Sequence, residues 1–146
     1  MFVALYVDDI VTIAETSEVM ENTKKQLVKR FHMKDLGQFH YVLGINCVWN
    51  ETNDKIRLTQ EVFISKLIDK YGLSEANEVS TPCDSNAVLM KTDGISKPVD
   101  KLFYQSLIGS MLYIALCTRP DIQFAVSVVA RYSSEPDQLH LTAAKR

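Results

Sequence analysis

Two adjacent carboxylates, Asp8 and Asp9, lie between strongly apolar runs at residues 2–5 and 10–13. Burying neighbouring negative charges is costly unless a cation or hydrogen-bond donors compensate them. Consecutive side chains on a straight strand point to opposite faces, so a sharp turn is needed to direct both carboxylates toward one ion. An isolated Asp-Asp pair is more often an ordinary turn, because Asp favours turn geometry. The apolar flanks shift the interpretation toward a metal site.

These flanks also predict the local structure. Exposed hairpins alternate apolar and polar residues, whereas both runs here are apolar at successive positions. Such runs are typical of central strands that are covered on both faces. We therefore expect adjacent antiparallel strands at Phe2 to Val7 and Ile10 to Ala14, with Asp8 and Asp9 at the tip and a helix beginning at Ser17 packed over them.

With Tyr6 placed two residues before Asp8, the stretch Tyr6-Val7-Asp8-Asp9 closely resembles the catalytic hairpin of reverse transcriptases. Further blocks follow in the order found in copia-type LTR retrotransposon polymerases. These blocks are residues 31–37 (FHMKDLG), 41–45 (YVLGI), 58–60 (LTQ), 79–82 (VSTP), 106–110 (SLIGS) and 118–122 (TRPDI). Six blocks in one order indicate a resemblance that extends over the whole chain.

The resemblance implies two-metal nucleotidyl transfer with Mg²⁺, a hard cation that prefers oxygen ligands. It implies that Asp8 is a direct metal ligand and Asp9 the second carboxylate. Tyr6 and Val7 would contact the template-primer or shape the nucleotide pocket. Lys34 resembles the lysine that protonates the departing pyrophosphate, although an exposed lysine near a helix end has a simpler explanation.

Residues 41–45 resemble the primer grip, a hairpin that holds the end of the primer near the metals. Tyr41, Leu43 and Gly44 would then carry that role, with Gly44 permitting close approach. A simple half-buried strand explains the alternation of this segment equally well. The order of the blocks favours the primer grip.

The family also uses a carboxylate from an earlier palm strand, and we expect that strand and the fingers to precede Met1. A chain without them should not polymerise DNA alone. The implied partners are an RNA or DNA template-primer and a deoxynucleoside triphosphate. One departure from the family pattern is Leu141, where a tryptophan often follows the residue equivalent to His140.

The 146 residues are 47% hydrophobic and 23% charged, with a formal net charge of −2, which is ordinary globular composition. This charge argues against general electrostatic attraction to nucleic acid, so any contact must be local. Five cations do cluster in one stretch of the chain, namely Lys24, Lys25, Lys29, Arg30 and Lys34. Such a cluster is typical of a solvated helix face, and it only suggests a contact with nucleic acid.

The three cysteines are far apart and indicate neither a disulfide framework nor a zinc site. His32, His40 and His140 share no ligand spacing, and we interpret them as satisfied or solvent-facing. Arg119, before Pro120, is interpreted as bracing a helix end. Neither a signal peptide nor a membrane span is indicated, so we expect an intracellular, cytoplasmic protein.

The periodicities predict an α+β fold, with a partial polymerase palm followed by a small helical thumb-like bundle. Residues 1–59 would form the partial palm, 60–135 the thumb-like region and 136–146 the start of a connection. The predicted elements are a helix at 17–33, strands at 39–49 and 55–58, a helix from 59 to 71 ended by Gly72, a polar excursion at 74–100, and helices at 101–117, 120–132 and 138–146.

Two alternative functions remain. The chain could be a non-enzymatic remnant, degenerate or co-opted, that binds nucleic acid. A metal-dependent phosphoesterase would need a further carboxylate or histidine at the hairpin, which the sequence does not supply. If strands of the palm sheet are missing, an exposed sheet edge would also favour self-association.

Overall fold

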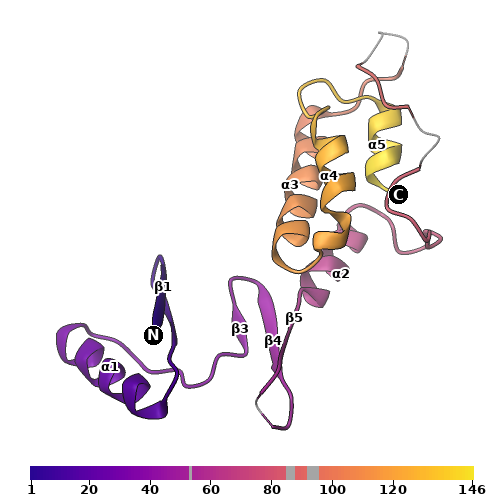
Figure 1. Ribbon diagram of the computed structural model, residues 1–146. Helices are drawn as coiled ribbons and strands as arrows, with labels where there is room; N and C mark the ends of the chain where they lie inside the picture. Colours follow the sequence, from indigo (N-terminus) through magenta and orange to yellow (C-terminus); the bar gives the residue numbers. More distant parts are fainter. Residues whose placement is uncertain (53, 85–87, 92–95) are drawn as a thin grey trace. The chain divides into compact units, whose positions relative to one another are not determined.

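The computed structural model describes residues 1–52, 54–84, 88–91 and 96–146. The chain divides into two compact units, Met1–Phe39 and His40–Arg146 (Figure 1). Antiparallel strands and helices occur in both units, which confirms the predicted α+β class. The division of the chain into palm, thumb-like region and connection stays a prediction.

The first unit consists of a β-hairpin and one helix. Strands β1 (Phe2–Tyr6) and β2 (Asp9–Ile13) pair antiparallel, and helix α1 follows at Ser17–Arg30. Thr16 caps the helix, because its side chain accepts a hydrogen bond from the Val19 amide at 3.3 Å. The Thr12 hydroxyl donates to the Met20 sulfur at 3.1 Å, which ties β2 to α1.

The predicted hairpin is confirmed, but the prediction that both faces are covered is wrong. Every residue of β1 is exposed, and only the middle of β2 is half-buried. Within residues 1–39, all of which are described, the sheet has two strands and α1 is the single helix. Two strands and one helix cannot enclose both faces of a sheet, so the apolar side chains remain accessible.

Helix α1 ends at Arg30, three residues before the predicted end at Met33. Phe31 has extended backbone angles (φ −128°, ψ 145°). The Lys24 ammonium lies 3.0 Å from the Asp35 carboxylate. In a continuous helix these two residues would be about 16 Å apart along the axis, so the ion pair requires the chain to turn back.

The second unit begins with a three-stranded antiparallel sheet in the order β3-β4-β5. Its strands are β3 (Tyr41–Val42), β4 (Ile45–Trp49) and β5 (Ile56–Thr59). The prediction of one continuous strand over 39–49 is wrong, because the chain reverses at Leu43 and Gly44. Both turn residues have left-handed backbone angles, with φ of 51° and 78°.

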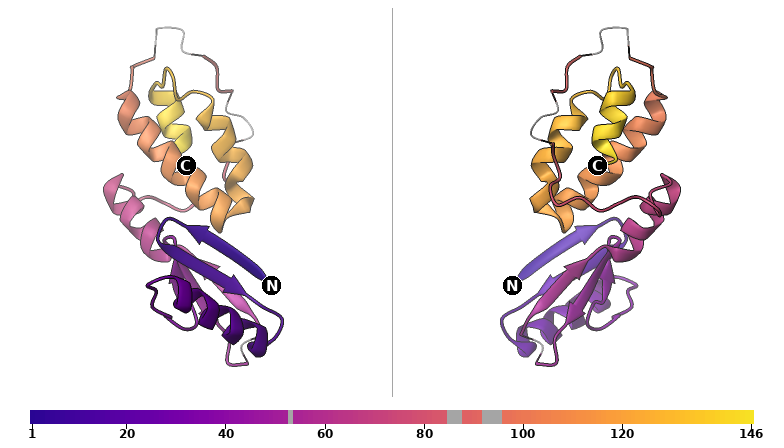
Figure 2. Two further views of the ribbon diagram at one scale, coloured as in Figure 1. Left: turned by 90° about the vertical axis from the view of Figure 1, so that its left-hand side faces the viewer. Right: turned by 90° about the vertical axis from the view of Figure 1, so that its right-hand side faces the viewer.

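Helices form the rest of the second unit, and α3, α4 and α5 lie side by side (Figure 2). The elements are α2 (Glu61–Lys70), α3 (Lys101–Cys117), a 3₁₀ turn η1 (Pro120–Ile122), α4 (Gln123–Ala130) and α5 (Gln138–Ala144). Tyr104, Ile108 and Val129 form the buried centre of this bundle. The core of the described chain therefore lies in the helical part.

The predicted helix ends are largely confirmed. Gly72 ends α2 with a φ of 65°, and the Asp100 carboxylate caps α3 by accepting from the Phe103 amide at 2.7 Å. The helix predicted at 120–132 divides into η1 and α4 and ends at Ala130. Where residues 74–100 are described, they carry no helix or extended strand, as expected for an excursion. None of the described helices has the length and apolar character needed to cross a bilayer.

Candidate active site

The two carboxylates occupy different positions in the first hairpin. Tyr6 pairs with Asp9 across the strands, which leaves Val7 and Asp8 as a two-residue turn. Asp8 therefore lies in the turn itself, and Asp9 is the first residue of β2. This turn lets neighbouring carboxylates approach one ion without the strict alternation of a continuous strand.

The turn before Asp8 holds its backbone in an unusual conformation. Val7 has a φ of 50°, in the left-handed region that β-branched residues rarely adopt. Left-handed geometry costs about 1–2 kcal/mol for a residue with a Cβ atom. Such strain is often found at functional sites, where the required position of a neighbouring group outweighs its cost.

The chemistry of the pair fits part of a magnesium site. Asp8 and Asp9 are both exposed and supply only oxygen ligands. Among the described residues, no group of three or more His, Cys, Asp and Glu side chains is placed to hold a metal. Mg²⁺ often keeps several waters and binds through one or two carboxylates together with substrate phosphates. The pair therefore suits a weak, incomplete site that a substrate would complete.

The residues beside the pair are accessible to a ligand. Tyr6 and Val7 are exposed to 60% and 78%. Lys34 lies in the irregular segment after α1 and is also exposed. The next residue, Asp35, accepts hydrogen bonds from the Gly37 amide and Lys24, and these bonds lower the pKa of its carboxyl group below the ordinary value. That anchored carboxylate fixes the course of the backbone beside Lys34.

The second predicted site is a separate hairpin in the second unit. Tyr41 pairs with Asn46 and Val42 with Ile45, so Leu43 and Gly44 form the turn. The hydroxyl of Tyr113, on α3, donates a hydrogen bond to the Leu43 carbonyl. A Cβ atom at position 44 would lie 3.2 Å from that hydroxyl. Glycine is thus required here by both the positive φ and the close approach of the tyrosine.

Sequence reasoning did not identify Tyr113, which anchors this turn from 70 residues away. Its ring also packs edge-on against Phe63, with ring centroids 5.4 Å apart. Tyr113 follows the Ser106–Ser110 block on the same helix, but helical spacing alone does not say which turn its hydroxyl reaches. The one sequence feature that pointed to this contact was Gly44, because a residue without a side chain permits another group to approach closely.

Gln60 was also missed, although it belongs to one of the resembling blocks. It is 2% exposed, and its amide oxygen accepts a hydrogen bond from the Thr118 hydroxyl at 2.7 Å. Its amide nitrogen has no hydrogen-bond partner among the described residues. Gln60 and Thr118 join the start of α2 to the end of α3, so two of the blocks quoted above meet in the fold.

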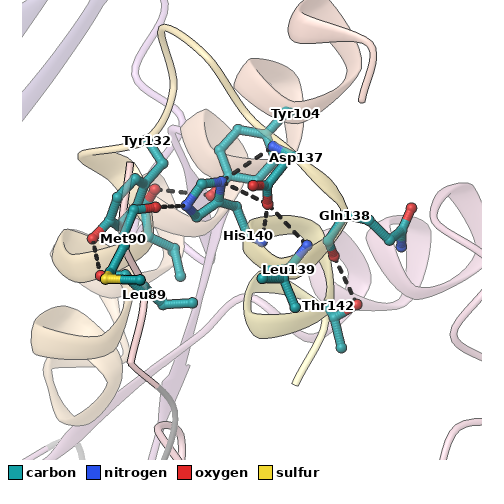
Figure 3. Close-up of polar contacts among 10 residues, drawn as sticks. Leu89, Met90, Tyr104, Tyr132, Asp137, Gln138, Leu139, His140 and Thr142 are labelled. Carbon is teal, nitrogen blue, oxygen red and sulfur yellow. Dashed lines mark hydrogen bonds and ion pairs between the residues drawn. The ribbon is translucent and has the colours of Figure 1, made fainter. Parts of the chain in front are cut away.

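His140 is the centre of a buried polar network (Figure 3). Its Nδ1 accepts from the Asp137 backbone amide at 3.1 Å, and its Nε2 lies 2.9 Å from the Met90 carbonyl oxygen. The ring stacks on Tyr132 with centroids 4.0 Å apart, and the Tyr132 hydroxyl donates to the Leu89 carbonyl at 2.7 Å. The interpretation of His140 as a satisfied histidine is confirmed, and its contacts hold residues 89–90 against the bundle.

A cavity of about 770 Å³ lies in the second unit, where Met111, Val126 and Val129 form part of its apolar lining. Arg119 lies at this cavity and pairs with Asp121 through Nη2 and Oδ2 at 2.8 Å, as expected for a residue that braces the start of η1. None of the predicted site residues lines the cavity. We therefore do not include it in the candidate site.

Comparison with known proteins places the first hairpin in a family. A family model described as reverse transcriptase (RNA-dependent DNA polymerase) matches residues 1–85. That match includes the Asp8 and Asp9 turn and the Leu43 and Gly44 turn. No solved structure gives a significant match.

Curated relatives match along nearly the whole chain. The retrovirus-related Pol polyprotein from transposon TNT 1-94 of Nicotiana tabacum is 36% identical over 97% of this chain, which covers 11% of that protein. The retrovirus-related Pol polyprotein from transposon RE1 of Arabidopsis thaliana is 33% identical over 100% of the chain, covering 10% of it. An uncharacterized mitochondrial protein of Arabidopsis thaliana is 31% identical over 100% of the chain, covering 59% of it. The chain thus spans about a tenth of each polyprotein.

Proposed function

Since this chain belongs to the reverse transcriptase (RNA-dependent DNA polymerase) family, we propose that it is a segment of the RNA-directed DNA polymerase of a copia-type retrotransposon. The observation that carries this proposal is the strained two-residue turn that presents Asp8 beside Asp9 within the matched region. Residues 1–59 serve as the second half of the palm, 60–135 as the thumb and 136–146 as the start of the connection.

In the parent polymerase, Asp8 is a direct Mg²⁺ ligand and Asp9 the second carboxylate. Mg²⁺ bound there would supply activation of the primer hydroxyl and stabilisation of the leaving pyrophosphate. Tyr6 and Val7 line the place where the nucleotide meets the template-primer, and their exposure supports this role. Lys34 donates a proton toward the departing pyrophosphate, with its backbone held by the neighbouring Asp35.

The Leu43 and Gly44 turn acts as the primer grip, together with Tyr41. A grip must hold the primer backbone at a defined position, and the hydrogen bond from Tyr113 supports that rigidity. Tyr41 is 64% exposed and therefore accessible to nucleic acid. The grip's partner is the end of an RNA or DNA primer annealed to its template.

By itself the chain does not polymerise DNA. Two carboxylates from one turn bind Mg²⁺ weakly, and the incoming nucleotide needs further groups to hold its phosphates. Well-oriented reactants gain roughly 7–11 kcal/mol, so incomplete positioning removes many orders of magnitude in rate. The exposed strand β1 also favours self-association of the isolated chain through its sheet edge.

The test is a chimera. Residues of this chain replace the matching segment of the tobacco transposon polyprotein, which is 36% identical to it. We expect RNA-templated primer extension that is lost in the Asp8→Asn chimera, while the isolated chain extends no primer above background. Thermal unfolding of both chimeras controls for folding. A folded chimera that is inactive, or equally active with Asn at position 8, would contradict the proposal and favour a non-enzymatic remnant.

A further inference from the structure

Positive charge is concentrated in one short stretch of the first unit. Residues 24–34 contain five Lys and Arg side chains and no Asp or Glu, which makes this stretch +5 in a chain whose formal sum is −2. The remaining residues therefore sum to −7. Such a separation of charge is typical of a local contact with a polyanion.

Four of these five cations are available to a ligand. Lys24 is engaged, since it lies 3.0 Å from Asp35 and 3.6 Å from Glu21. Lys25, Lys29, Arg30 and Lys34 are exposed and make no ion pair with any residue for which the structure gives a position. Of the five cations in residues 24–34, only Lys24 is therefore neutralised by acidic side chains among the described residues.

These four cations lie on α1 and on the segment that directly follows it. Lys25 and Lys29 are one turn apart on α1 and share a helix face. After Arg30 the chain turns back, as Figure 1 shows, and the Lys24–Asp35 pair holds the returning segment against the helix. Lys34, next to Asp35, is thereby returned toward the part of α1 that carries Lys24 and Lys25. The ion pair between Lys24, the fifth cation of the stretch, and Asp35 thus shapes the surface.

Helix electrostatics explain only part of this cluster. The partial negative charge at a helix C-terminus favours cations within the last turn, which accounts for Lys29 and Arg30. Lys25 lies before that turn and Lys34 lies beyond the helix. Moreover, like charges four residues apart destabilise a helix, so Lys25 and Lys29 work against the stability of α1.

An aromatic residue lies within the same stretch of sequence as the cations. Phe31 directly follows Arg30 and is 58% exposed. Proteins that bind single-stranded nucleic acid combine cations along the backbone with aromatic rings on which the bases stack. An acidic membrane surface would also use the cations, but membrane binding strengthens with the apolar area buried, and one ring supplies little of it.

We propose that Lys25, Lys29, Arg30, Lys34 and Phe31, together the α1 basic surface, bind a single-stranded nucleic acid. The four cations contact successive phosphates, and the Phe31 ring stacks on a base. The surface needs neither metal nor the carboxylates of the first hairpin. Lys34 also belongs to the proposed polymerase role, but the surface can be tested separately because the variants below that should weaken binding change only Lys25, Lys29 and Phe31.

The experiment is fluorescence anisotropy of the full 146-residue chain with a labelled oligouridylate, in EDTA, over a range of NaCl concentrations. We expect a dissociation constant on the order of 10⁻⁴ to 10⁻⁶ M and a slope of log K against log salt of about −2.8 for four contacts. The Lys25→Glu/Lys29→Glu variant should bind at least about 10-fold more weakly, with a slope about 1.4 units shallower.

Further variants separate the contribution of the Phe31 ring to binding from that of the cations. Phe31→Ala should weaken binding about 5-fold or more and leave the salt slope unchanged, because stacking releases no counterions. The matched control Lys66→Glu/Lys101→Glu changes net charge equally on α2 and α3, and should bind nearly as the native chain does. Asp8→Asn should also bind normally, which separates this surface from the hairpin.

Several results would overturn the proposal. Equal loss of binding in the control pair would show attraction without a defined surface. Stronger binding to duplex than to the single strand, or unchanged affinity in Phe31→Ala, would exclude the stacking arrangement. Preference for phosphatidylserine vesicles over the oligouridylate would assign the surface to membranes instead.

Discussion

The two β-hairpins of this chain have similar turns but very different support. Each has a two-residue turn whose first residue is bulky and left-handed, Val7 with a φ of 50° and Leu43 with a φ of 51°. The second turn is held from α3 by the Tyr113 hydroxyl. The first turn accepts no hydrogen bond from a side chain in the described part of the molecule.

The difference shows how a protein can retain a strained turn in two ways. At Leu43, a glycine follows and a tertiary contact offsets part of the conformational cost. At Val7, the following residue is Asp8, and no side-chain hydrogen bond from the described residues offsets the cost of about 1–2 kcal/mol. A turn kept in this state is suited to a ligand, since binding can supply the missing interactions.

Removing the anchor should have the largest effect. Tyr113→Ala deletes a ring that packs on Phe63 and a hydrogen bond to Leu43, so we expect about 2–4 kcal/mol lower free energy of unfolding of the second unit. The matched variant Tyr6→Ala, at an exposed position, should cost about 0.5 kcal/mol or less. Urea unfolding followed by circular dichroism measures both. Equal losses would mean that the two hairpins are supported alike.

Alkaline pH should loosen the helix that carries the anchor. Burial raises the pKa of Tyr104, on α3, from 10.0 to about 12, with a smaller contribution from the Asp137 charge. Because the folded-state pKa is the higher one, this stability is complete below pH 10 and is lost as the pH rises toward 12.

The loss should reach roughly 2–3 kcal/mol, and urea midpoints measured across this pH range report it. Tyr104→Phe is the control, since it removes this titration while giving up about 1 kcal/mol for the bond to the Val129 carbonyl. An identical alkaline loss in the Phe variant would assign the effect to other groups.

Filling the space at the second turn should have an intermediate effect. Gly44→Ala puts a Cβ 3.2 Å from the Tyr113 hydroxyl at a φ of 78°, so we expect a loss of about 2 kcal/mol. Gly37→Ala is matched in backbone, with a φ of 77° and no atom within 4 Å, and should cost about 1 kcal/mol. The difference between these two losses of stability isolates the contact with the Tyr113 hydroxyl. If the difference is unchanged in a Tyr113→Phe background, that contact is not its cause.

Relieving strain at the first turn should have the smallest effect and the opposite sign. Val7→Gly removes the Cβ that opposes left-handed geometry and should stabilise the hairpin by up to about 1 kcal/mol. Val3→Gly, within β1, should instead destabilise it by a similar amount, because glycine weakens a strand. Backbone NMR chemical shifts report the hairpin population. A destabilising Val7→Gly would show that Val7 is unstrained.

Several elements could be predicted because their signals are local. Helix α3 was expected at residues 101–117 and occupies Lys101–Cys117, where Asp100 supplies the cap. The reversal at Asp8 was also predicted, since the Asp-Asp pair and its flanks lie within a few residues. Caps, turns and short apolar runs act over one helical turn or one strand, so a single sequence contains them.

The break at Leu43 and Gly44 was missed for a physical reason. A two-residue turn preserves the odd-even alternation of side chains, so Tyr41, Leu43 and Ile45 continue the pattern of an unbroken strand. The end of α1 was also missed, since the local pattern does not show that the chain turns back after Arg30 and brings Asp35 to Lys24. Both features depend on residues that lie outside the local sequence pattern.

The sequence by itself determined the family, the α+β class and the position of the two carboxylates at a hairpin, because these follow from motifs and short-range periodicity. Only the tertiary structure decided which turn is anchored, which apolar faces stay exposed and where His140 belongs. Those outcomes depend on residues far apart in the chain, such as Leu43 and Tyr113 or Met90 and His140. Their contacts arise from packing in three dimensions, which the spacing of residues along one chain does not encode.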